Sequence, residues 1–197
     1  MNRTAEHTRQ TAETEIKMAV DLDRPGQRTI DSGIPFLDHL LTLFAAHARM
    51  SLQVDAEGDL EADEHHTMED LGLVLGACLK EALGTKAGIA RYGACLLPMD
   101  ETLVRVALDL SGRPCLVYNV ATPVPQISGI DMRLFREFFQ ALTNNLGLSL
   151  HIDLLRGDEN HHVLEAVFKG FARALAQACA PDAAWADEVP STKGNLG

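Results

Sequence analysis

The 197-residue chain lacks the marks of several large classes of protein. Its longest apolar run, LGLVLGACL, covers only about half of a membrane span, so we expect no membrane segment. The polar opening, MNRTAEHTRQT, has no apolar core of the kind that a secretory signal contains. Its four cysteines form no C-x-x-C pair, which argues against a disulfide framework or a thiolate zinc site and favours free thiols in a reducing cytoplasm. They are Cys78, Cys95, Cys115 and Cys179.

Basic residues are also scarce. The chain has 17 Lys and Arg against 28 Asp and Glu, which gives a formal net charge of -11, and no basic cluster interrupts this balance. Such a protein repels phosphate backbones, so we expect no nucleic-acid partner, and a small anionic substrate would need a local basic pocket. With 46% hydrophobic and 23% charged residues, the composition is that of a globular protein with one domain or two small ones.

What the sequence does contain is an internal duplication. ETEIKMAVDLD (Glu13–Asp23) recurs 88 residues later as ETLVRVALDLS (Glu101–Ser111), and alternating apolar residues predict a half-buried strand in each copy. DHLLTLFAAHARMSLQV (Asp38–Val54) recurs 98 residues later as REFFQALTNNLGLSLHI (Arg136–Ile152), and its spacing predicts a helix followed by a strand.

The third repeated block is the motif His-His-x-x-Glu, which begins at His65 and again at His161, each time heading an apolar segment that predicts a helix. Because the blocks recur in the same order, we predict an α+β fold with an internal duplication of two sheet-plus-helices halves. The halves would cover about residues 8–90 and 91–180 and pack together, each as one or two strands, a helix, a strand and a helix. Residues 181–197 would form a tail.

The doubled motif suggests metal binding. An α-helix turns by about 100° per residue, so the Glu falls on the same side of the first turn as both histidines. Adjacent histidines diverge too much to share one ion easily, so the motif indicates two sites, and mixed nitrogen and oxygen donors suit Mn, Fe, Zn, Co or Ni. One copy alone would more simply be a surface hydrogen bond or a helix cap. The candidate ligands are His65, His66, Glu69, His161, His162 and Glu165.

Other polar residues gain interest from the duplication or from their setting. His39 and Glu137 occupy equivalent places in the two copies, so each could supply a further ligand. Two arginines in glycine-containing turns and a Ser and Lys in the tail are the groups that a phosphate monoester needs, although each alone could be an ordinary surface residue. These four are Arg91, Arg113, Ser191 and Lys193.

Together the motifs resemble the imidazoleglycerol-phosphate dehydratase family of histidine biosynthesis. The resemblance runs from about Arg9 to the C-terminus, and the opening RQTAET is similar to the monofunctional form, which lacks a fused phosphatase. The segments that carry it are GIPFLDHLL (Gly33–Leu41), DEHHTMED (Asp63–Asp70), RYG (Arg91–Gly93), PMDE (Pro98–Glu101), DLSGRP (Asp109–Pro114), ENHHVLEAVFKGFARAL (Glu159–Leu175) and PSTKG (Pro190–Gly194).

The resemblance implies a reaction, a cofactor and an assembly. The reaction is the dehydration of D-erythro-imidazole-glycerol 3-phosphate to imidazole-acetol phosphate, through a metal-bound imidazolate and a diazafulvene-like intermediate. The cofactor is Mn²⁺, two ions per active site. The assembly is a homo-oligomer of 24 subunits with active sites at interfaces. Each half of the fold would resemble the second domain of ribosomal protein S5.

The resemblance also assigns residues. Glu13 would be the acid or base beside the substrate, with Glu69 and Glu165 as further catalytic carboxylates, although a metal-bound water competes for the role of base. The metal ligands would be His39, His65, His66, Glu69, His161, His162 and Glu165, and the duplication adds Glu137 as a candidate. The substrate and its phosphate would be held by Glu13, His39, His47, Arg91, Arg113, Lys169, Ser191 and Lys193.

Two questions stay open at this point. Some family members have His where this chain has Glu137, and although a carboxylate can bind Mn²⁺, the sequence does not decide whether this one does. The same ligands would also serve a dinuclear metallohydrolase or a non-enzymatic metal-binding cage. The cage would have no use for the phosphate-binding residues or for Glu13.

Overall fold

The computed structural model describes residues 3–122, 124–186 and 188–196. Its first half contains β1 (Thr4–Gln10), β2 (Thr14–Asp21), β3 (Arg28–Asp31), α1 (Pro35–Ala48), β4 (Ser51–Gly58) and α2 (His65–Leu83). The second half contains β5 (Tyr92–Met99), β6 (Thr102–Asp109), β7 (Cys115–Asn119), α3 (Met132–Leu146), β10 (Ser149–Arg156) and α4 (Asn160–Cys179). A short hairpin of β8 (Gln126–Ile127) and β9 (Ile130–Asp131) precedes α3.

The two halves have the same topology, which confirms the predicted α+β fold with a duplicated unit of sheet and helices. The strand order is β1-β2-β4-β3 in one sheet and β5-β6-β10-β7 in the other. β2 and β6, which the first repeated block predicts, show the same alternation of buried and less buried side chains along their eight residues. In each sheet the last strand runs parallel to its neighbour, and the other pairs are antiparallel.

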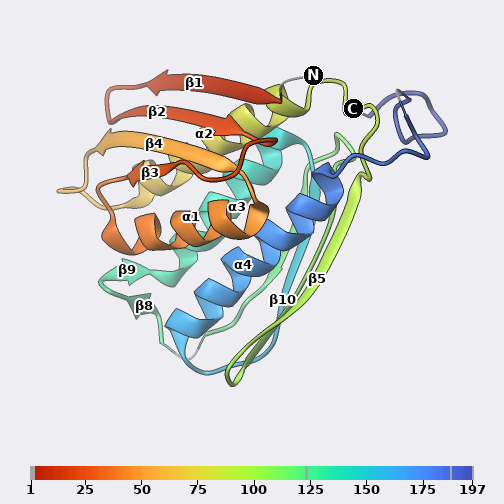
Figure 1. Cartoon of the computed structure of the whole chain (residues 1–197). Coiled ribbons are helices and arrows are strands. Elements are labelled where there is room, and N and C mark those ends of the chain that lie inside the picture. Colours follow the sequence, from red (N-terminus) through yellow and green to blue (C-terminus); the bar gives the residue numbers. More distant parts are fainter. Residues whose placement is uncertain (1–2, 123, 187, 197) are drawn as a thin grey trace.

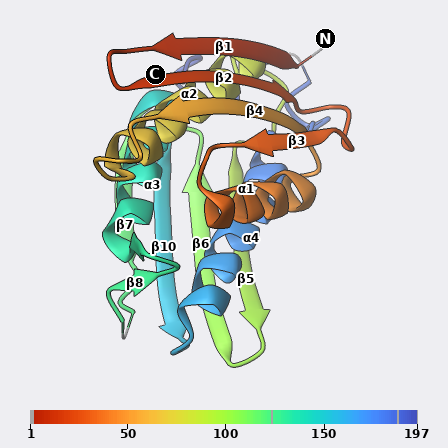
Figure 2. The same ribbon diagram turned by 90° about the vertical axis from the view of Figure 1, so that its left-hand side faces the viewer.

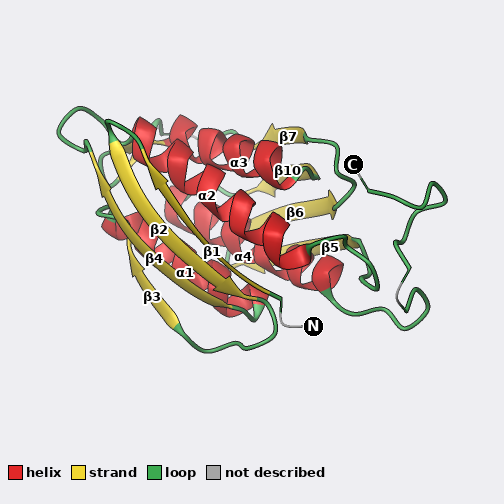
Figure 3. Cartoon of the chain, turned by 90° about the horizontal axis from the view of Figure 1, so that it is seen from above, coloured by secondary structure: helices red, strands yellow, loops and turns green. Residues whose placement is uncertain are grey.

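The helices lie between the two sheets, as Figures 1 and 2 show. α1 and α2 pack on the first sheet, and α3 and α4 pack on the second. Across the middle, α1 packs on α4 and α2 packs on α3, and the view from above in Figure 3 shows the helices of the two halves side by side. Each helix that carries a His-His-x-x-Glu motif therefore meets the first helix of the other half.

The core is shared by the halves. The rings of Phe44 on α1 and Phe171 on α4 stack with their centroids 5.5 Å apart. Where α2 meets α3, glycine permits the close approach of the helices, because a Cβ at Gly72 would lie 2.4 Å from the carbonyl oxygen of Phe138. Since apolar side chains of one half complete the core of the other, the two halves form one structural unit.

β1 differs from the sequence-based prediction. The predicted boundary at residue 8 falls inside this strand, which begins at Thr4. β1 is an edge strand that buries Ala5 and leaves most of its other side chains exposed, so the apolar alternation that reveals β2 is missing. β5 is the corresponding edge strand of the second half. Among the residues that the structure describes, no helix is both long and apolar enough to cross a membrane.

Candidate active site

The repeated motifs form the first turns of α2 and α4. The side chain of Glu159, at the N-cap of α4, accepts hydrogen bonds from the backbone N–H groups of His161 (3.1 Å) and His162 (3.0 Å). At α2, Asp63 accepts a hydrogen bond of 2.8 Å from the N–H of His65. Such acceptors satisfy free amide groups at a helix N-terminus and complement the helix dipole. An acidic residue just before each motif thus fixes where the histidine pair begins the helix.

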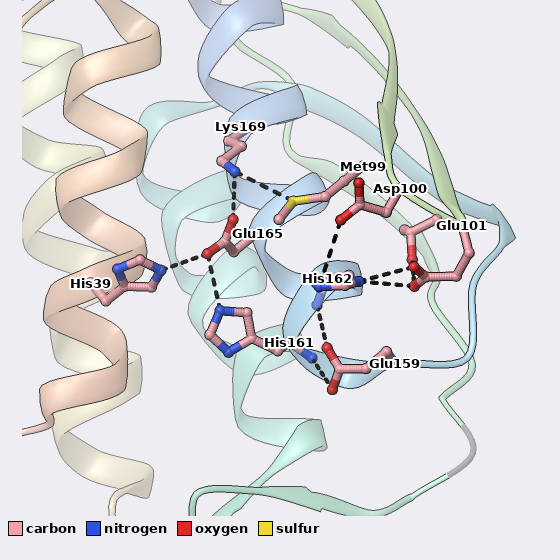
Figure 4. A network of polar contacts seen from close by, with 10 residues as sticks. His39, Met99, Asp100, Glu101, Glu159, His161, His162, Glu165 and Lys169 are labelled. Atoms are coloured by element: carbon pink, nitrogen blue, oxygen red, sulfur yellow. Dashed lines mark hydrogen bonds and ion pairs between the residues drawn. The ribbon is translucent and has the colours of Figure 1, made fainter.

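Three predicted metal ligands come together where α1 packs on α4, as Figure 4 shows. The Nε2 atoms of His39 and His161 lie 2.7 Å and 3.0 Å from the same oxygen of Glu165, Oε1. The other oxygen, Oε2, accepts a hydrogen bond of 2.5 Å from Nζ of Lys169. Glu165 is only 7% exposed, whereas both imidazoles are exposed. The buried carboxylate is therefore held by Lys169, while the two exposed histidines remain accessible to a ligand.

Glu165 is an ionised carboxylate at neutral pH. Burial raises the pKa of this group, but hydrogen bonds from Lys169, His39 and His161 outweigh burial and bring the pKa to about 2. A carboxylate that is ionised at neutral pH and lies beside two imidazole nitrogens is suited to bind a cation.

In the first half, the ring planes of His66 and its neighbour His65 are inclined at 63°. Nδ1 of His66 lies 3.0 Å from Oδ2 of Asp59 and 3.6 Å from Oε2 of Glu13. The hydrogen bond to Asp59 raises the pKa of His66. The structure thus places the predicted proton-transfer residue, Glu13, beside a predicted metal ligand, with its carboxylate about half exposed.

His162 repeats this arrangement in the second half. Its Nδ1 lies 3.0 Å from Oε2 of Glu101, and its Nε2 lies 3.9 Å from Oδ2 of Asp100 (Figure 4). The hydrogen bond to Glu101 raises the pKa of His162. The rings of His161 and His162 are inclined at 87°, so the adjacent histidines face different directions, as two separate metal sites would need.

The remaining predicted ligands are less closely grouped. Nε2 of His65 lies 3.7 Å from Oε2 of Glu69 on the same face of α2. Glu137, on α3, pairs with its neighbour Arg136 at 3.1 Å. His39 and Glu137 are thus equivalent in the duplication, and α3 packs on α2 as α1 packs on α4. Of these two equivalent residues, only His39 makes a hydrogen bond to the motif of the opposite half within the described part of the chain.

Four predicted phosphate-binding residues line one cavity of about 600 Å³ near the C-terminal end of α4: Arg91, Arg113, Ser191 and Lys193. The guanidinium group of Arg91 donates two hydrogen bonds to Asp109, of 2.7 Å and 3.0 Å, and a third of 2.8 Å to the carbonyl oxygen of Pro190. The contact with Asp109 raises the pKa of Arg91. This arginine therefore joins the end of β6 to the tail that carries Ser191 and Lys193.

Lys169 and His47, also predicted to bind the substrate, line a different cavity of about 500 Å³ together with Arg173. Burial lowers the pKa of His47, and the charges of Lys169 and Arg173 lower it further. The cavity lined by Arg91 is also remote from the metal ligands. The backbone N–H of Arg91 donates to the carbonyl oxygen of Ala178, near the C-terminal end of α4, whereas His161 lies at its N-terminal end. From His161 to Ala178, α4 rises by about 25 Å.

Residues 32–175 match the family model described as Imidazoleglycerol-phosphate dehydratase. The chain belongs to the imidazoleglycerol-phosphate dehydratase family. A member from Geobacter metallireducens is 54% identical over 100% of this chain and 100% of its own length. A member from Xanthobacter autotrophicus is also 54% identical, over 99% of each chain. The crystal structure of the Staphylococcus aureus dehydratase is 39% identical, with a TM-score of 0.83 over 91% of this chain and 99% of that chain. The structure from Pyrococcus furiosus is 34% identical, with a TM-score of 0.82 over 96% and 100%.

The donor set of this family member fits a transition-metal cation such as Mn²⁺. The ligand atoms of His39, His161 and Glu165 all lie within 4.8 Å of one another. Two imidazole nitrogens and one carboxylate oxygen form a mixed donor set. This set suits Mn²⁺ better than Mg²⁺ or Ca²⁺, which prefer oxygen ligands only. Lys169 occupies Oε2 of the carboxylate and leaves Oε1 directed at the two histidines.

Three carboxylates of the site were missed by the sequence analysis. Asp59, Glu101 and Asp109 hold His66, His162 and Arg91 through hydrogen bonds. For Glu101 a signal was present, because the duplication aligns it with Glu13, 88 residues earlier. For Asp59 there was none, since the residue 98 positions later is Gly157.

Proposed function

We propose that the chain is a dehydratase that converts D-erythro-imidazole-glycerol 3-phosphate to imidazole-acetol phosphate and water, in L-histidine biosynthesis. The observation that carries this proposal is the 54% identity to dehydratases of the family over the whole chain. The cluster of His39, His161 and Glu165 and the cavity lined by Arg91 and Lys193 support it, because a metal site and a phosphate site are what this reaction needs. The four free thiols support a place in the cytoplasm.

We further propose two Mn²⁺ ions per active site. His39, His161 and Glu165 would supply ligands to one ion, and their counterparts Glu137, His65 and Glu69 would supply ligands to the other. The packing of α1 on α4 and of α3 on α2 supports this division, because it brings equivalent helices of the duplication together. The rings of His66 and His162 are inclined to those of their neighbouring histidines at 63° and 87°, which suits adjacent histidines that bind different ions.

The active site would be completed by a second copy of the chain. In the substrate, three carbon atoms separate the imidazole from the phosphate. Within one chain, the metal ligand His161 and the phosphate-lining Arg91 lie near opposite ends of α4, about 25 Å apart. One substrate molecule cannot reach both, so the metal ligands of one subunit would face the phosphate cavity of another. This geometry supports a homo-oligomer with shared sites, and the resemblance puts the number of subunits at 24.

In the reaction, hydroxide leaves the carbon attached to the imidazole, and a proton leaves the next carbon. The resulting enol becomes the ketone of the product. Mn²⁺, when bound, supplies Lewis acidity that makes the imidazole N–H more acidic. Arg91, Arg113 and Lys193 would hold the phosphate, which fixes the distance of the reacting carbons from the metal site. Glu13, half exposed beside His66, would take the proton from the carbon.

The test is turnover of imidazole-glycerol phosphate by protein stripped with a chelator and then supplied with Mn²⁺. We expect activity to vanish and to return with the ion, and the product to be a ketone that absorbs as its enolate in strong base. Release of inorganic phosphate instead would identify a metallohydrolase. Folded, metal-loaded protein that forms neither product would leave the non-enzymatic metal cage as the function.

A further inference from the structure

In both halves, the second histidine of the motif is held through the same ring atom. Nδ1 of His66 lies 3.3 Å and 3.0 Å from the two oxygens of Asp59, and Nδ1 of His162 lies 3.1 Å and 3.0 Å from the two oxygens of Glu101. The two acids come from unrelated places, because Asp59 follows β4 whereas Glu101 lies in the turn between β5 and β6. The same contact has therefore been built twice by different means.

A hydrogen bond to one ring nitrogen decides what the other can do. When Nδ1 carries the proton and donates it to a carboxylate, Nε2 keeps a free lone pair and can bind a metal ion. Carboxylates in this position fix the ring orientation and increase the basicity of the ligand, and their loss typically lowers metal affinity by 10- to 100-fold. Building on the proposed function, we propose that Asp59 and Glu101 are positioning residues that make Nε2 of His66 and His162 the metal-binding atoms.

The two halves differ in a way that follows from this assignment. Glu13 and Glu101 are counterparts in the duplication, yet Glu101 contacts its histidine at 3.0 Å while Glu13 stays 3.6 Å from His66, too far for a good hydrogen bond. In the first half Asp59 already holds the imidazole, which leaves the carboxylate of Glu13 free to move a proton. The second half has Gly157 at the position of Asp59, so Glu101 must hold His162 itself. Equivalent carboxylates of the two halves thus have different roles.

Manganese affinity separates these roles from each other. We expect Glu101→Ala and Asp59→Ala to raise the dissociation constant for Mn²⁺ by about 10- to 100-fold in equilibrium dialysis, with the same number of ions bound at saturation. Asp59→Asn should recover part of the affinity, because its amide oxygen can still accept from Nδ1–H. Glu13→Gln should bind Mn²⁺ as tightly as the wild type and lose turnover. Glu61→Gln removes a charge from the same loop as Asp59 but has an exposed side chain, so it serves as the control.

Three outcomes would overturn the assignment. Unchanged Mn²⁺ affinity in both alanine variants would remove Asp59 and Glu101 from the site. Fewer ions bound at saturation would make them metal ligands rather than positioning residues. An equal loss of Mn²⁺ affinity in Glu61→Gln would show that the effect comes from the change in net charge. Wild-type protein that binds Mn²⁺ but does not dehydrate the substrate would refute the proposed function and leave the affinity comparison valid, so the two failures are distinguishable.

Discussion

Nε2 of His39 on α1 lies 2.7 Å from Oε1 of Glu165 on α4, although 126 positions separate the two residues in the sequence. The contact exists because α1 of the first half packs on α4 of the second. The stacked rings of Phe44 and Phe171 hold the same two helices together. The candidate metal site is therefore a product of the junction between the halves, and its geometry depends on the core packing beneath it.

His39→Ala should weaken metal binding without unfolding the protein. The change removes one nitrogen donor from the cluster, and the side chain of His39 is exposed, so little packing is lost. We expect Mn²⁺ affinity to fall at least tenfold, which corresponds to about 1.4 kcal/mol, as measured by equilibrium dialysis. His151→Ala, which removes an exposed imidazole from β10, is the control. Equal affinities in the two variants would show that His39 is no ligand.

Mixed oligomers test whether the active site is shared. Arg91→Ala removes a phosphate-lining group, and His161→Ala removes a metal ligand some 25 Å away along α4. We expect each variant alone to be nearly inactive. When the two variants are denatured together and refolded, they should recover part of the wild-type turnover. Some sites then combine the intact metal ligands of one subunit with the intact phosphate cavity of another. A mixture of Arg91→Ala with Lys193→Ala should stay inactive, since both changes damage the same cavity. No recovery in the first mixture would contradict a shared site.

Gly72→Ala should destabilise the protein. The new Cβ would lie 2.4 Å from the carbonyl oxygen of Phe138, so the backbones of α2 and α3 would have to separate. Overpacking of this kind costs about 1–3 kcal/mol, which is measurable by chemical denaturation. Gly170→Ala is the matched control within a helix, because its nearest neighbour is a methyl group of Val106 at 3.0 Å, which can yield more easily. Destabilisation by both changes to the same degree would contradict this account of the α2–α3 contact.

His47 should make the protein less stable in mild acid. Burial lowers the pKa of this imidazole below its ordinary value of 6.5, and nearby cations add to the effect. The unfolded state therefore binds a proton at a higher pH than the folded state does. The stabilising contribution of neutral His47 is complete above pH 6.5 and is lost as the pH falls through the folded pKa. The charged groups around it are Lys169, Arg173 and Glu165 on α4, with Arg3, Arg49 and Asp100 along the adjoining cavities.

Melting temperatures between pH 8 and pH 5 check this prediction. The stability difference between the wild type and His47→Gln should shrink as the pH falls, because glutamine does not titrate. A difference that is independent of pH would mean that His47 is already protonated or equally exposed in both states. His151→Gln, at an exposed position on β10, should leave the pH dependence unchanged.

The fold could be predicted from the sequence because the duplication doubles every signal. β2 and β6 alternate in the same way, and the helix that carries His39 aligns with the helix that carries Glu137. β1 could not be found, since an edge strand with few buried side chains lacks apolar periodicity. For the site, sequence spacing explains why His161 and Glu165 share a face of α4. It cannot supply contacts between elements, such as Asp59 with His66, which depend on how a loop folds back over a helix.

The crossed packing of the helices has a consequence for the origin of the chain. Because α1 meets α4 and α2 meets α3, each half buries its helices against those of its twin, as two identical subunits do in a symmetric dimer. A chain of half this length, paired with its own copy, would have the same layers and two identical histidine clusters. Fusion of two such genes would keep the arrangement and release each cluster from the requirement to match the other. Glu101 and Glu13 would then be descendants of one residue, free to differ only since the fusion.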